Sequence, residues 1–199
     1  MDKKSLPKSF FRKNPVNRIS SAFFTCLTIR LYENDVEDVM TEVSNEILLS
    51  SELEEIKKHR EEIEQLDSGE AVVRFMRRGC ETVNYAALVD KALAMQDETF
   101  PLILDRLRTT GQDVFVDVAV WALIKGDQVY VDRLKTMYPE IRSLYAQSQA
   151  CLVFGMRKCE DTLPLLLSEY ERMLREDTGE GYCQGPLLAI HLLFDKLKI

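Results

Sequence analysis

The chain has 199 residues, of which 46% are apolar and 30% charged, and its net charge is −7. This balance is ordinary for a globular domain and excludes an intrinsically disordered chain. No apolar run reaches the roughly 18–20 residues that a membrane helix needs. The apolar stretch 19–29 is interrupted by serine and threonine and is followed by no small-residue cleavage site. The sequence therefore predicts a cytoplasmic protein without a membrane partner.

The charge is unevenly placed along the chain. Residues 1–18 carry six basic side chains and one acidic one, a local charge of +5, which leaves −12 for residues 19–199. With Pro7 and Pro15 opposing a packed helix, residues 1–17 are predicted to form a basic, flexible arm, and residues 18–199 one domain. An acidic body argues against general nucleic-acid binding, because phosphate contacts need clustered Lys and Arg.

The five cysteines, odd in number and without a CxxC spacing, predict neither a disulfide framework nor a zinc site. They are expected to be free thiols packed as small apolar groups. No metal or other cofactor is predicted. The glycine-rich segment 179–185 lacks the Lys-Ser/Thr of a phosphate loop and follows a predicted helix instead of a strand.

Helical periodicity runs through nearly the whole chain, with no convincing strand pattern. A short strand near residues 27–31 is a minor alternative to the first helix. Ser51 with Glu54 forms a capping-box pattern for a charged helix in which His59 is expected to be solvent-exposed. The predicted helices, in chain order, span 18–32, 35–50, 52–66, 70–80, 84–96, 98–109, 112–125, 128–138, 141–157, 161–175 and 182–198.

A recurring block organises these helices. Residues 98–104 (ETFPLIL) return as residues 161–167 (DTLPLLL), and the two prolines lie 63 positions apart. That distance accommodates two units of about thirty residues, each one helix pair. Pro101 is expected in the first turn of its helix, where its missing N–H costs little. We therefore predict an all-α, right-handed solenoid of about five antiparallel helix pairs, with helix 18–32 as an N-terminal cap.

The same residues carry a resemblance to the HEAT-like repeat family, in particular its short class first noticed in phycobilisome lyases. They are the helix openings at 100–103 and 163–166, the second-helix pattern Val116, Ala119, Ala122, Leu123, Gly126 and Asp127, and a weaker echo at Ala87, Ala92, Leu93 and Asp97. The resemblance implies that the second helix of each pair lines a concave surface. The predicted core residues are Phe75, Leu88, Leu102, Leu104, Val118, Ala119, Leu123, Leu152, Leu166 and Leu193.

The candidate binding residues follow from this placement of the second helices. Asp113, Asp117, Trp121 and Lys125 recur at i+4 on helix 112–125 and so share one stripe. A Trp anchor flanked by acids is typical of a recognition surface, although a core Trp with a structural Asp117 is the alternative. Neighbouring second helices add Tyr145 and Gln149 and, near the C-terminus, His191 and Asp195, which could also form a simple surface ion pair.

These features predict a non-catalytic module, a scaffold or adaptor, that binds a partner protein on a concave, acidic face, through a basic segment of that partner. No nucleophile–base arrangement is readable from the spacing, so the chain is not expected to be an enzyme. A HEAT-like nucleic-acid-binding or DNA-repair-like protein is one alternative, and a bilin lyase follows from the family resemblance alone. A tetratricopeptide-like adaptor is a further alternative, although the Trp, Leu-Gly and Tyr spacing of that repeat is absent.

Overall fold

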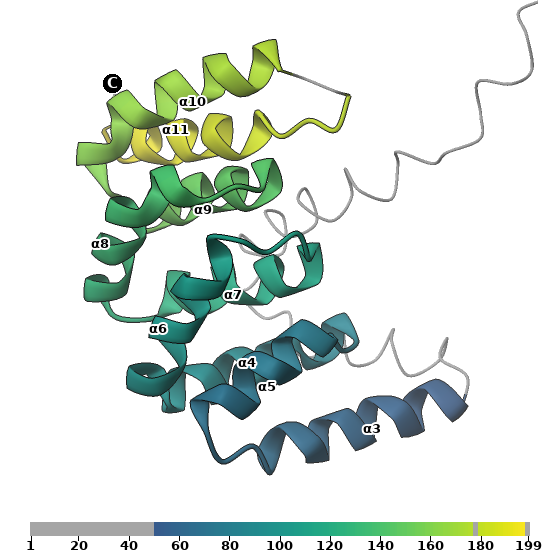
Figure 1. Ribbon diagram of the computed structural model, residues 1–199. Helices are drawn as coiled ribbons and strands as arrows, with labels where there is room; N and C mark the ends of the chain where they lie inside the picture. The colour runs from purple at the N-terminus through teal and green to yellow at the C-terminus, as the bar shows by residue number, and fades with distance from the viewer. Residues whose placement is uncertain (1–49, 177–178, 198–199) are drawn as a thin grey trace, which may run out of the picture. The chain divides into compact units, whose positions relative to one another are not determined.

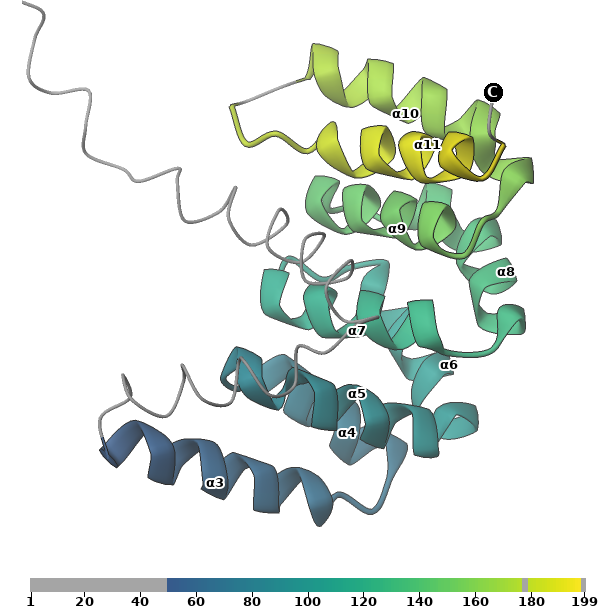
Figure 2. The same cartoon turned by 180° about the vertical axis from the view of Figure 1, so that it is seen from behind.

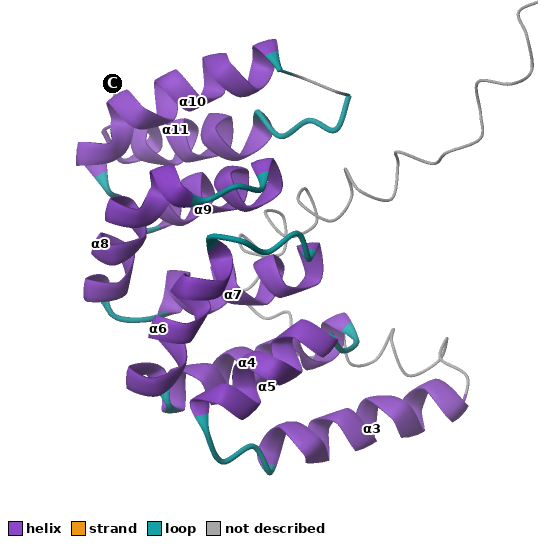
Figure 3. Ribbon diagram, viewed as in Figure 1, coloured by secondary structure: helices purple, strands orange, loops and turns teal. Residues whose placement is uncertain are grey.

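The computed structural model describes residues 50–176 and 179–197, and the expected helices 18–32 and 35–50 lie outside these residues. Contacts divide the chain into two units, and the helices described below belong to the larger, residues 49–177 with 182–199. The described part is all-helical and contains no strand, as predicted (Figure 3). Its α-helices are α3 (Ser50–Glu64), α4 (Gly69–Arg78), α5 (Tyr85–Ala94), α6 (Gln96–Leu107), α7 (Asp113–Lys125), α8 (Gln128–Met137), α9 (Leu144–Met156), α10 (Leu163–Arg175) and α11 (Gln184–Leu197). Short 3₁₀ turns are η1 (Thr82–Asn84), η2 (Tyr138–Glu140) and η3 (Glu160–Thr162).

The helices alternate between two layers (Figures 1 and 2). In one layer α5 packs on α7, α7 on α9, and α9 on α11, with α3 beside α5. In the other, α4 packs on α6 and α6 on α8, while α10 packs on α11. Side chains from α5, α7 and α9 are thus brought together although each helix is some thirty residues from the next.

Local capping chemistry explains why the helices begin and end where they do. The Ser68 side chain accepts a hydrogen bond from the Ala71 N–H at the start of α4 (3.4 Å), and Ser143 does the same for Ala146 at the start of α9 (3.3 Å). Gly79 ends α4 with φ +80°, a left-handed conformation that favours glycine. α7, which is apolar on nearly every side, buries seven of its thirteen residues.

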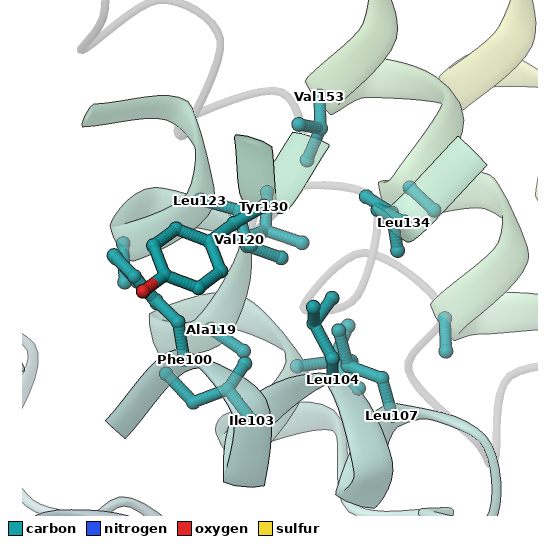
Figure 4. Close-up of a cluster of buried hydrophobic side chains, with 14 of the residues drawn as sticks. Phe100, Ile103, Leu104, Leu107, Ala119, Val120, Leu123, Tyr130, Leu134 and Val153 are labelled. Carbon is teal, nitrogen blue, oxygen red and sulfur yellow. The ribbon is translucent and has the colours of Figure 1, made fainter. Parts of the chain in front are cut away.

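The core lies between the two layers and is centred on α6 and α7 (Figure 4). Nine of the ten predicted core residues are buried, and the exception is Leu102, whose side chain is 36% exposed. The buried stripe of α6 runs through Phe100, Ile103, Leu104 and Leu107, which is i, i+3, i+4, i+7 spacing. Leu102 lies on the opposite side of the helix, so its assignment to the core was wrong.

The two repeated blocks coincide in part. Ile103 and Leu166 are fully buried at matching positions, and Thr99 and Thr162 are both buried. Leu104 is buried, whereas its counterpart Leu167 is 47% exposed. Pro164 lies in the first turn of α10, as expected. Pro101 does not lie in the first turn, because α6 begins at Gln96 and the proline falls inside it.

Two glycines bring α9 and α11 into close contact. A Cβ at Gly155 would lie 2.4 Å from the Ala189 Cα, and one at Gly185 would lie 2.2 Å from the Ser148 carbonyl oxygen. Both distances are shorter than any van der Waals contact, so only glycine allows this helix pair to approach so closely.

None of the helices in the described part of the chain has both the length and the apolarity that a bilayer crossing requires.

Candidate functional site: an acid–tyrosine cluster

An acid and three tyrosines from successive segments meet on the layer formed by α5, α7 and α9. The Tyr145 hydroxyl, on α9, donates a hydrogen bond to the Asp117 carboxylate on α7. The Tyr182 ring, just before α11, lies 6.3 Å from the Tyr145 ring at an interplanar angle of 59°. Tyr85, the first residue of α5, interacts electrostatically with Asp117. We call Tyr85, Asp117, Tyr145 and Tyr182 the acid–tyrosine cluster.

All four side chains are partly exposed. The Ser148 hydroxyl donates a hydrogen bond to the Tyr182 carbonyl (2.6 Å), which holds this residue against α9. Tyr85 and Tyr145 pack on the edge of the hydrophobic core. The cluster therefore presents one carboxylate and several aromatic rings at the edge of the packed core.

Burial controls the electrostatics of the cluster. It raises the pKa of Asp117 to about 6, partly offset by the hydrogen bond from Tyr145 and reinforced by the nearby charge of Asp113. Burial and the Asp117 charge together raise the pKa of Tyr85 to about 12, and the same two causes raise the pKa of Tyr145. Tyr85 and Tyr145 therefore stay protonated at neutral pH, whereas Asp117 changes charge near neutrality.

The structure places the other predicted binding residues in different surroundings. Asp113 and Trp121 are partly exposed on α7, with Trp121 packed on the core edge, and Lys125 is exposed at the end of that helix. Gln149 is only 6% exposed, so its prediction as a surface binding residue was wrong: α9 turns this side inward. His191 is exposed on α11, and the side chain of Asp195 lies outside the described part.

Tyr85 and Tyr182 were missed by the sequence reasoning. Tyr85 opens a helix and Tyr182 lies in the glycine-rich segment, so neither belongs to a periodic polar stripe. The stacking of helices brings these two tyrosines close to Asp117, and such stacking produces no local pattern in the sequence. Their one shared feature is position: each lies near the N-terminal end of a helix in the same layer, as Asp117 and Tyr145 do.

His59 was predicted to be solvent-exposed, and this was wrong. Its side chain is 17% exposed, and its Nδ1 lies 2.9 Å from both carboxylate oxygens of Glu81. The ring also stands edge-on to Phe75, with the centroids 5.9 Å apart. The sequence separation of 22 residues between His59 and Glu81 hid this contact.

Two surface hollows of about 600 Å³ each lie in the other layer, one between the end of α6 and η2 and one between α6 and α8. Both are lined by Asp105, Arg108 and Glu140. Arg108 lies 3.8 Å from the Asp105 carboxylate and 3.5 Å from that of Glu140. Acidic and basic side chains lie side by side in both hollows, so neither is lined by charges of a single sign.

The raised pKa of Asp117 predicts a pH-dependent gain in stability for Asp117→Asn. A carboxyl whose folded-state pKa (about 6) exceeds its unfolded value (about 3.9) destabilises the fold as pH rises between these values. At pH 7 the variant should therefore be more stable by about 1–2 kcal/mol, allowing for the partial exposure of the side chain. Urea unfolding at pH 7 and pH 4 measures this difference, which should vanish at pH 4. An equal difference at both pH values would contradict the expected titration.

Comparison of the chain with protein-family models, curated proteins and solved structures finds no match.

Proposed function

We propose that the chain is a non-catalytic protein-binding module, a helical-repeat scaffold or adaptor whose α5–α7–α9 layer takes a basic segment of a partner protein. The observation that carries the proposal is the acid–tyrosine cluster with Asp113 and Trp121 beside it on α7. A carboxylate with aromatic side chains beside it can bind a lysine or arginine side chain through an ion pair and cation–π contacts.

The alternating layers support the helical-repeat part of the proposal. Packing of α5 on α7, α7 on α9 and α9 on α11 repeats one interaction along the chain, and stacked repeats use such a continuous layer as an extended binding surface. A right-handed solenoid with a concave α5–α7–α9 face, as the HEAT-like resemblance implies, would display the cluster at its centre.

Charge supports a basic partner. Residues 19–199 carry a net charge of −12, which steers a cationic segment toward the surface and opposes nucleic acid. Asp117 would be ionised at pH 7 and would gain a counter-ion on binding, which offsets part of the cost of burying its charge.

Binding of a lysine- and arginine-rich peptide tests the proposal. Trp121 is the single tryptophan, so its emission reports binding at this surface without a label. We expect the emission to change with the basic peptide, with an affinity that falls as salt increases, and not with a peptide carrying glutamate at the same positions. Trp121→Ala should weaken the binding free energy by about 2 kcal/mol or more, as at other aromatic hot spots. Calorimetry measures this loss, because the variant has no tryptophan emission.

Asp105→Asn is the matched control for Asp117→Asn, since Asp105 is an exposed acid of the other layer. The Asp117 variant should bind the basic peptide several-fold more weakly, and the Asp105 variant should bind like the unchanged protein. Equal affinities of the two variants would refute the site. Preferential binding of duplex DNA would favour the nucleic-acid alternative instead.

A further inference from the structure

A second polar cluster joins α3 to the segment between α4 and η1. Glu55 and His59 lie one turn apart on α3, and Glu81 immediately precedes η1. The ligand-type atoms of the three side chains, one from each, all lie within 4.8 Å of one another. The His59 Nδ1 lies 2.9 Å from both carboxylate oxygens of Glu81.

A buried amide holds this cluster in place. Asn84 has no exposed surface, and its Nδ2 donates hydrogen bonds to the Glu81 Oε2 (3.1 Å) and to the Ile56 carbonyl of α3 (3.0 Å). The Asn84 Oδ1 is also buried and has no hydrogen-bond partner within the described residues. Hydrogen bonds that orient a carboxylate and packing that orients an imidazole, here against Phe75, are how proteins position metal ligands from outside the coordination shell.

We propose that Glu55, His59 and Glu81 form a binding site for a divalent transition-metal ion of the zinc class. Zinc bonds to imidazole nitrogen and carboxylate oxygen are about 2.0–2.2 Å long, which places the donors of a tetrahedral site about 3.4 Å apart. The cluster spans separations from 2.9 Å to 4.8 Å, so small side-chain rotations suffice. A mixed nitrogen and oxygen set suits zinc better than calcium or magnesium, which take oxygen ligands.

The site would fasten α3 to the rest of the domain. Among the α3 side chains whose burial is described, only Ile63 is buried, so this helix has little apolar contact to hold it. Three protein ligands leave one tetrahedral position for water. A simple ion pair between His59 and Glu81 is the competing explanation of the cluster, and it has no need of Glu55.

Thermal unfolding of the full chain with zinc chloride, under reducing conditions, tests the proposal. Zinc at about 100-fold excess over its Kd should raise the Tm by about 5 °C or more, and calorimetry should give one ion per chain. Glu55→Gln and His59→Gln should each abolish this rise. Glu54→Gln, which removes an exposed charge one position away on the same helix, should keep it. Cys80→Ser should also keep it, because the thiol beside Glu81 is not one of the ligands.

Three results would overturn the inference. An absence of any zinc-dependent shift would show that the cluster is only an ion pair. An undiminished zinc-dependent rise in Tm in Glu55→Gln would show that Glu55 is not a ligand. Loss of the shift in Cys80→Ser would place the bound ion on cysteine. Glu54, Glu55 and His59 lie on α3, outside the acid–tyrosine cluster, so the results with these variants are independent of peptide binding.

Discussion

Replacing Leu123 by alanine is expected to lower the free energy of unfolding by about 2–5 kcal/mol, since it removes a large apolar side chain from the core and leaves a cavity. Leu123 is fully buried on α7, in the cluster that also contains Phe100 and Tyr130 (Figure 4). Phe100 and Tyr130 are themselves in ring contact, with centroids 4.8 Å apart, so the surroundings have little freedom to collapse into the space. Chemical denaturation measures the loss.

Leu102→Ala is the matched control, because it makes the same chemical change at a leucine that is 36% exposed on the outer side of α6. It should cost less than about 1 kcal/mol, as surface substitutions do. Equal losses for the two variants would mean that the orientation of α6 or α7 about its axis differs from the one described.

Gly155→Ala should destabilise the protein by about 2–3 kcal/mol, although alanine favours a helix over glycine by about 1 kcal/mol. The added methyl group would lie 2.4 Å from the Ala189 Cα and 2.8 Å from its Cβ, so α9 and α11 would have to separate. Backbone atoms cannot rotate away as a flexible side chain can, and the cost of overpacking exceeds the gain in helix propensity. The Tm from thermal unfolding measures the result.

Gly111→Ala provides the comparison. A Cβ at Gly111 would meet nothing within 4 Å, and the residue does not have a left-handed backbone. Alanine there should leave stability unchanged or raise it slightly, by reducing the freedom of the unfolded chain. If Gly155→Ala proved as harmless as Gly111→Ala, the close contact between α9 and α11 would be wrong.

The helices could be predicted from periodicity because each apolar stripe is a local property of the chain. Each of the nine helices expected within the described residues exists, with ends shifted by a few residues where 3₁₀ turns take over, as at η1 and η3. The error at Leu102 was one of helix phase. Pro101 was expected in the first turn of a helix spanning 98–109, but the stripe of Phe100, Ile103, Leu104 and Leu107 already defined which side is buried.

The candidate sites were less predictable because they depend on contacts between distant segments. The i+4 stripe on α7 predicted Asp117 and Trp121 on one face of the helix, but the hydrogen-bond donor to Asp117, Tyr145, is 28 residues away. The contact of His59 with Glu81 likewise spans 22 residues. No periodicity within one helix encodes which residues of the next helix it will face.

The glycine contacts of α9 and α11 also determine where the domain can bend. Sliding one helix past the other by a turn, about 5.4 Å, would bring side chains to the points where Gly155 and Gly185 now fit. These two helices should therefore move as one rigid body, carrying Tyr145 and Tyr182 together. If the domain flexes, we expect α9 to move relative to α7. The hydrogen bond from Tyr145 to Asp117 joins these two helices. A partner that contacts both Asp117 and Tyr145 would therefore hold α7 and α9 together.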